Sequence, residues 1–441
     1  MNESTRLEYS ACASLGALGM QFQQLKVWTI VKEHVRLKQK VRHHDPLDKL
    51  LDGFISILAG GNGLVEINTR VRPDHALQMA FGRQGCAEQS TVSRTVNACT
   101  AENVSQMRTA LTAILRLHGQ SYCHDYEQRW QVLDVDLTGM PAGRQGEGVT
   151  TGYFPNEKNR RGRQLGRVLA TLYDEIIVDR LYEGKRVLHR SLQELLLIAE
   201  DVLELAENKR AATIVRVDAG GGEDADIDWL LQRHYWVLAK AKSWRRAHKL
   251  ATSVMEWHLD PKVPEREVGW VTAPHVYETA TRQLAVRHRK KNGKWSYHVL
   301  VFNLTDAMLY WLADRPVPQA PHAGEVLLTA LHAYDRRGGG VETQNRGDKQ
   351  GLGLSHRNKH AFAAQEMLVL LGQLAHDVVV WTRNRLAQAN PRLRRYGIQR
   401  TVRDALHIDG RVAITPAGIV EQVILNDRHP LASAFQSAYS Q

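Results

Sequence analysis

Several features that would classify this 441-residue sequence are missing from it. Its four cysteines are scattered, at Cys12, Cys86, Cys99 and Cys123. None belongs to a Cys-x-x-Cys pair, so a zinc ribbon is disfavoured and a disulfide framework has no support. No apolar run approaches the ~20 residues that a membrane-spanning helix needs, and the N-terminus lacks the apolar core of a signal peptide. We therefore expect no membrane association and a reducing, cytoplasmic location.

Acidic residues are outnumbered by basic ones. The sequence has 58 Lys and Arg against 47 Asp and Glu, which gives a formal net charge of +11. This excess does not define a fold, but it is typical of a protein whose partner is a polyanion. The length allows two or three domains, and we find neither low-complexity segments nor internal repeats.

The apolar patterns change along the chain and predict five segments. Residues 1–125 show helical patterns and are predicted to form an all-α domain. Residues 126–242 alternate strands with helices, which predicts the first part of an α/β core with a mixed sheet flanked by helices. Residues 243–322 are typical of a β-rich insertion. Residues 323–390 return to helices as the second part of the core, and residues 391–441 form a tail with short strands.

Two predicted strands end in aspartate. In "WQVLDVDLTGMP", side chains alternate, so Asp134 and Asp136 share one face of the strand. Asp218 closes a second apolar strand, "TIVRVD", shortly before three glycines. An ionised carboxylate is costly to bury unless it is paired or binds a metal. Because open α/β sheets keep their sites at the carboxyl ends of strands, we expect two of these carboxylates to converge there.

A third carboxylate is expected from the helices after the insertion. Glu342 in "YDRRGGGVETQNRGDK" is the candidate, and Lys349 follows it seven residues later, on the same face of a continuous helix. A pair of Mg²⁺ ions held by such carboxylates serves phosphodiester chemistry. The alternative for Glu342 is an ordinary solvated helix with mixed charges.

Together these motifs resemble the DDE transposases of bacterial insertion sequences that carry a Tyr-Arg-Glu-Lys signature after a β-rich insertion. "DVDLTG" is similar to the first-aspartate strand and selects Asp136, because Thr follows that Asp two residues on. "RVDAGGG" is similar to the second-aspartate strand, and "YDRR…VETQNRGDK" to the signature. The long apolar segment "HAFAAQEMLVLLGQLAHDVVVW" and the N-terminal "QSTVSRTV" are also similar to these proteins, so that the resemblance extends from about residue 50 to the end.

The resemblance implies an RNase H-like core that binds two Mg²⁺ or Mn²⁺ ions, cuts DNA at transposon ends and joins those ends to target DNA. The implied catalytic and metal-binding residues are Asp136, Asp218 and Glu342. The implied DNA contacts of the signature are Tyr334, Arg337 and Lys349. Pairing of two ends implies at least a homodimer on DNA, and DNA as partner implies a nucleoid-associated protein in a bacterial cytoplasm.

One departure from the family's pattern concerns the gap between Arg337 and Glu342. Four residues separate them instead of three, and three of the four are glycines, each of which costs a helix roughly 1 kcal/mol relative to alanine. Either the helix begins at Val341 or the geometry is distorted. Two alternatives therefore remain: a catalytically impaired DNA-binding relic, and a structure-directed nuclease with the same core.

Basic clusters flank the two aspartate strands and are predicted to contact the DNA backbone, which would make binding fall steeply with salt. The predicted contacts of the first cluster are Arg160, Arg161 and Arg163. Those of the second are Lys240, Lys242, Arg245 and Arg246.

Overall fold

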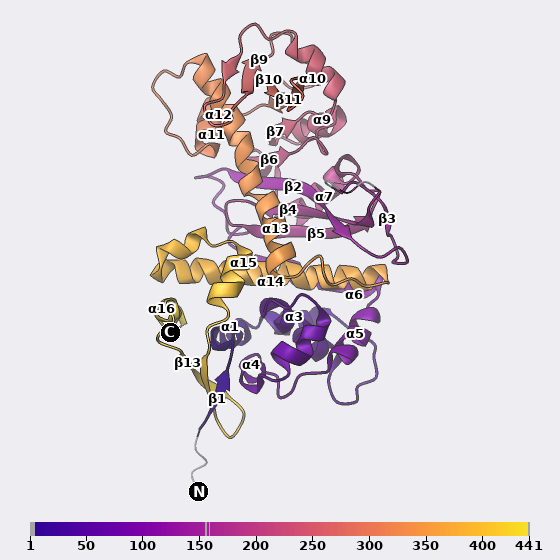
Figure 1. Cartoon of the computed structure of the whole chain (residues 1–441), viewed down its shortest axis with the longest axis vertical. Helices are drawn as coiled ribbons and strands as arrows, with labels where there is room; N and C mark the ends of the chain where they lie inside the picture. Colours follow the sequence, from indigo (N-terminus) through magenta and orange to yellow (C-terminus); the bar gives the residue numbers. More distant parts are fainter. Residues whose placement is uncertain (1–4, 155–156, 158, 440–441) are drawn as a thin grey trace. The chain divides into compact units, whose positions relative to one another are not determined.

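The computed structural model describes residues 5–154, 157 and 159–439, which form two compact units (Figure 1). Unit 1 comprises Met1–Gly119, Met140–Arg163 and Gln344–Gln441, and unit 2 comprises Gln120–Gly139 and Gln164–Thr343. The N-terminal region and the tail thus share a unit. The five expected segments, whose boundaries differ from these, stay a prediction.

Unit 1 is built mainly of helices around one buried apolar cluster. Local signals fix several of them: Asp45 caps α3 by accepting from the Leu47 amide, and Thr100 with Asn103 forms a capping box on α6. The helices of its N-terminal part are α1 (Ala13–Gln24), α2 (Val27–His34), α3 (Pro46–Leu58), η1 (Leu64–Glu66), η2 (Ile67–Val71), α4 (His75–Ala80), α5 (Gln89–Asn97) and α6 (Ala101–His118). Those of its C-terminal part are α14 (Phe362–Ala389), η5 (Pro391–Arg395), α15 (Ile398–Arg400), η6 (Thr401–Ala405) and α16 (Ala432–Tyr439).

The long helix α14 packs against α6, α3 and α16 within unit 1 (Figure 1). Among the described residues it is the one helix long and apolar enough to cross a membrane, although the sequence led us to expect none. Of its most apolar window, 89% is buried inside the fold, as in the core helix of a globular protein.

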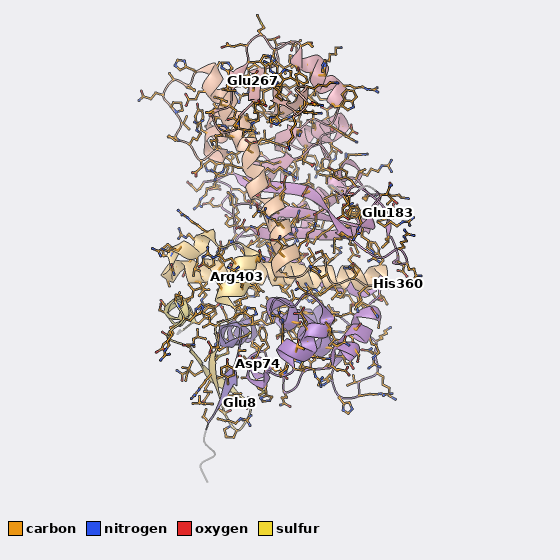
Figure 2. All side chains as sticks on the ribbon, in the orientation of Figure 1. Glu8, Asp74, Glu183, Glu267, His360 and Arg403 are labelled. Carbon is orange, nitrogen blue, oxygen red and sulfur yellow. The ribbon has the colours of Figure 1, made fainter. Side chains whose placement is uncertain are left out.

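The N-terminal region was predicted to be all-α, but its first described element is a strand. Strand β1 (Arg6–Ser10) pairs antiparallel with β12 (Gly410–Ile414), which pairs with β13 (Val420–Leu425). Side chains connect this strand to the start of α4: His75 bonds Glu8, and Asp74 accepts from the Ser10 hydroxyl at 2.7 Å. Glu8 and Asp74 are labelled in Figure 2. Strand β1 pairs with a strand some 400 residues away, so the local periodicity of its sequence did not predict it.

Unit 2 contains a large mixed sheet flanked by helices. Its strand order runs β4-β2-β6-β7-β11-β10-β9-β8, and β5 also pairs with β4. The strands β2, β6 and β7 are parallel, whereas β7 and β11 are antiparallel, as are β10 with β11 and β9 with β10. The mixed α/β fold class is therefore confirmed. The strands are β2 (Gln131–Pro141), β4 (Arg161–Ala170), β5 (Glu175–Glu183), β6 (Thr213–Val217), β7 (Trp236–Lys240), β8 (His258–Leu259), β9 (Arg266–Trp270), β10 (Arg282–Arg289) and β11 (Trp295–Phe302).

The ends of β2 and β4 reach into unit 1, where β3 (Thr150–Thr151) pairs with the start of β4. The helices of unit 2 are η3 (Leu188–Arg190), α7 (Leu192–Leu203), α8 (Glu207–Arg210), α9 (Asp224–Gln232), α10 (Trp244–Ala251), α11 (Asp306–Leu312), α12 (Ala323–Asp335) and η4 (Arg336–Gly339). Helix α13 (Val341–Gly351) begins in unit 2 and ends in unit 1. In the expected insertion, Gly293 takes φ +77° at the turn of the β10–β11 hairpin.

Candidate functional site

The first aspartate strand carries one paired and one site-facing carboxylate. Asp134 is fully buried and accepts two hydrogen bonds from Arg216, at 2.6 and 2.8 Å. This bidentate pair forms because Asp134 and Arg216 lie opposite each other in the parallel register of β2 and β6. The sequence analysis missed Arg216, although aligning the two aspartate strands at their ends would have placed it beside Asp134.

The same register brings Asp136 and Asp218 to adjacent strand ends. Val135 is paired with Val217, so the next residues on the two strands, Asp136 and Asp218, are neighbours on the same face. The Asp218 carboxylate accepts the Gly220 amide at 2.8 Å, which holds it at the start of the glycine turn. The convergence expected from the sequence is therefore present for this pair.

Glu342 enters from α12 and the short η4 turn that follows it. The buried cluster that contains Val132, Ile214 and Leu238 of the sheet also contains Leu327 and Leu331 of α12, so α12 packs over the face that carries the aspartates. After η4, α13 begins at Val341 and carries Glu342 in its first turn. Of the two possibilities left open by the sequence, a helix that begins at Val341 is the one observed.

Arg337 lies among these carboxylates. Its guanidinium donates to Glu342 at 3.0 Å, to Asp136 at 3.3 Å and to the Val135 carbonyl at 2.9 Å. The side chain is only 3% exposed, and its Nε has no hydrogen-bond partner among the described residues. The phosphate contact predicted for Arg337 is thus corrected for this state of the protein: the guanidinium is committed to the carboxylates of the site.

Electrostatics in the site follow from this crowding of charges. Burial raises the pKa of Asp136 to about 6, Arg337 opposes that rise, and Asp218 and Glu342 add to it. Burial lowers the pKa of Arg337, but the carboxylates of Asp136, Asp134 and Asp218 outweigh burial and raise it above its usual value. Asp136 is therefore repelled electrostatically by the other two predicted acids, and the positive charge of Arg337 partly offsets this repulsion.

The donors at this site suit a hard divalent cation in type. Asp136, Asp218 and Glu342 offer carboxylate oxygens, the ligands that Mg²⁺ prefers. In the described part of the chain, however, no three His, Cys, Asp or Glu side chains lie close enough together to hold one ion. The Arg337 guanidinium bridges two of the three acids and supplies positive charge there.

Gly340 explains the departure from the expected spacing. A Cβ on Gly340 would lie 2.3 Å from Asp134 Oδ2 and 3.0 Å from Thr171 Cγ2, so no larger residue fits there without displacement. At Gly339, by contrast, a Cβ would meet nothing within 4 Å. The residue before α13 must therefore be glycine if its backbone is to pass over the Asp134–Arg216 pair.

The other signature residues lie on either side of Glu342 along the chain. Tyr334 is half-buried near the end of α12, and burial raises its pKa. Lys349 lies on α13, as expected, but in the part of that helix that belongs to unit 1. Their DNA contacts stay predictions.

The first basic cluster contains one arginine that is not a surface residue. Arg163, 1% exposed, donates to the carbonyls of Glu147, Lys359 and His360, so its predicted DNA contact is wrong: it joins two loops of unit 1. Arg160 and Arg161 are exposed and line a polar hollow of about 580 Å³ in unit 1.

The second basic cluster is divided by its partners. Lys242 pairs with Glu223, and Arg246 with Asp224, whereas Arg245 is exposed and lies over the Trp244 ring. Lys240, the last residue of β7, belongs to the site instead. Its charge interacts with Asp218, Arg337 and Glu342.

Comparison with known proteins gives little further information. No protein-family model and no curated protein matches the chain. Among solved structures it is similar to piggyBac transposase, in a cryo-EM structure of the synaptic complex with hairpin DNA. The TM-score is 0.49 with 11% identity, covering 92% of this chain and 82% of that chain.

Proposed function

We propose that the chain is a metal-dependent DNA transposase that cuts DNA at the ends of its element and joins these ends to target DNA. The observation that carries the proposal is the parallel register of β2 and β6, which makes Asp136 and Asp218 neighbours on one face of the sheet. Glu342 interacts with Asp136 from the first turn of α13. Carboxylates gathered at the carboxyl ends of parallel strands are typical of α/β sites.

An RNase H-like arrangement of the core belongs to the same proposal. It is supported by the strands that follow one another as β2, β4 and β5, and then by β6 and β7, both parallel to β2. Helices connect β5 with β6 and β6 with β7. Strands β8 to β11 lie between this sheet and α12 in the chain, where the resemblance places a β-rich insertion.

Asp136, Asp218 and Glu342 would hold two Mg²⁺ or Mn²⁺ ions, which lower the pKa of an attacking hydroxyl and stabilise the leaving oxygen. In the cut, a water oxygen bonds to phosphorus, the P–O3′ bond breaks, and the 3′ oxygen takes up a proton. In the joining step, that 3′-hydroxyl loses its proton and its oxygen bonds to a phosphorus of the target, while the target's P–O3′ bond breaks and the released 3′ oxygen takes up a proton. Arg337 orients the carboxylates of Asp136 and Glu342 through its two ion pairs.

DNA as partner is supported by the net charge of +11 and by the arginine-lined hollow of unit 1. We propose a homodimer on paired ends, located at the nucleoid of a bacterial cytoplasm.

A nicking assay tests the proposed function. Wild-type protein is expected to nick an oligonucleotide that carries the element's end in Mg²⁺ or Mn²⁺. Asp136→Asn should abolish nicking while binding is kept, because the carboxylate is lost without a change of shape. Asp314→Asn is the control, since Asp314 is an exposed acid of unit 2. Equal nicking by wild type and Asp136→Asn would overturn the assignment of the site.

A DNA-binding relic is the second candidate. It is favoured by the ion pair of Arg337 with Asp136 and by the absence of a three-ligand cluster among the described side chains. It predicts that the wild type binds end DNA but gives no product with any divalent ion. Products joined to a target duplex, rather than cuts alone, would exclude a simple nuclease.

A further inference from the structure

A lysine completes the row of charged residues at the carboxyl edge of the sheet. Val217 is paired with Val135 on one side and with Ala239 on the other. The residues that follow these three are Asp218, Asp136 and Lys240, on three neighbouring parallel strands. Since side chains alternate along a strand, Lys240 points to the same face as the two aspartates.

The ammonium of Lys240 interacts with the site without being bound to any of its acids. Its charge acts on Asp218 and Glu342, yet within the described residues no carboxylate lies within 4 Å of it and it makes no hydrogen bond. The nearby basic residues Lys242 and Arg246 both have acidic partners. Lys240 therefore keeps its donors available in a half-buried position beside the acids.

The backbone around Lys240 is fixed by the glycine turn that follows Asp218. A Cβ on Gly222 would lie 1.8 Å from the Lys240 carbonyl oxygen, and the Lys242 amide donates to the Gly222 carbonyl at 2.9 Å. On the other side, Lys240 is paired with Leu300 of β11. The backbone of Lys240 is thus held at a strand end beside Asp218, from which its side chain extends.

We propose that Lys240 is a catalytic residue whose ammonium contacts a non-bridging oxygen of the scissile phosphate. Negative charge increases on these oxygens as the attacking oxygen bonds to phosphorus, and a positioned cation in a half-buried site stabilises that charge. Lysine contacts phosphate as a point charge with three donors. This inference rests on the proposed function and adds a residue to its reacting centre.

The test measures single-turnover nicking at saturating end DNA. Lys240→Gln should slow nicking by about 10²-fold, the effect typical of losing one such donor, while thermal stability stays unchanged. Lys240→Arg should recover part of the rate because it restores the charge. Lys185→Gln is the control: Lys185 is an exposed lysine of unit 2 that pairs with Glu183, which is labelled in Figure 2, and its loss should leave the rate unchanged.

A sulfur substitution in the DNA phosphate shows whether Lys240 contacts that phosphate or only supports the fold. Replacing the contacted non-bridging oxygen by sulfur in one stereoisomer should slow the wild type, but should slow Lys240→Gln little further. Equal sulfur effects in the two proteins, or a rate unchanged in Lys240→Gln, would overturn the inference while leaving the proposed function intact. An inactive wild type would overturn both.

Discussion

The prediction that most directly tests the geometry of the site is the cost of a side chain at Gly340. A Cβ there would lie 2.3 Å from Asp134 Oδ2, more than 1 Å inside ordinary van der Waals contact. The carboxylate cannot yield easily, because Arg216 holds both of its oxygens at 2.6 and 2.8 Å. Gly340→Ala must therefore displace α13 or break the buried pair.

The expected loss of stability lies between the cost of displacing α13 and the cost of breaking the buried Asp134–Arg216 pair. Overpacking a well-packed interior costs about 1–3 kcal/mol. Breaking a buried ion pair costs about 3–5 kcal/mol, since it leaves a charge without its partner. We expect about 3 kcal/mol, and a loss of nicking because Glu342 lies two residues further on.

Differential scanning calorimetry of the full chain measures this effect against a matched control. Gly339→Ala changes the neighbouring residue, where a Cβ meets nothing within 4 Å, and should leave the melting temperature unchanged or slightly raised. Gly340→Ala should melt lower by several degrees. If the two variants melt at the same temperature, the packing of Gly340 on Asp134 is refuted.

Three further predictions concern charges. Arg337→Gln should bind Mn²⁺ more tightly than wild type in DNA-free calorimetry, because the bridging cation is removed; unchanged or weaker binding would contradict this. Burial raises the pKa of Asp226 to about 6, so its ionisation destabilises the fold as pH rises from about 4 through 6; Asp226→Asn should be more stable than wild type at pH 8, and the gain should vanish as pH falls from 6 toward 4, as followed by urea unfolding. A gain independent of pH would exclude Asp226 as its source. Arg163→Gln should lower the melting temperature, because three carbonyls lose their donors, whereas exposed Arg161→Gln should not; equal melting would contradict the role of Arg163.

The two aspartates at neighbouring strand ends could be predicted from the sequence, because each closes a continuous apolar run. Alternation placed Asp134 and Asp136 on one face, and only the resemblance, through a Thr two residues after the Asp, favoured Asp136 as the site residue. The pairing of Asp134 with Arg216 was missed, because it becomes visible only once the register between two strands 82 residues apart is assumed, here by aligning their aspartate ends. A register is set by tertiary packing and is not encoded in either strand alone.

The sequence did not show which of the basic residues are exposed and which are buried. Arg161 and Arg163 are separated by one residue on β4 and read alike in the sequence, yet Arg161 is exposed while Arg163 is buried under two loops of unit 1. In the same way, β1 is a short strand whose partner, β12, lies near the other end of the chain. Contacts of this kind are absent from any local pattern.

The glycines before α13 weaken a helix that contains them, but they do not weaken this site. The cost of glycine applies to helix interiors, and Gly340 precedes the first residue of α13. Its missing side chain lets the backbone pass directly over Asp134, and Glu342 follows in the first turn of α13. The fourth residue between Arg337 and Glu342 is therefore accommodated by the short η4 turn, and Arg337 still reaches Glu342 at 3.0 Å. The longer gap therefore does not separate Glu342 from Arg337 and Asp136, and it is no argument against the proposed chemistry.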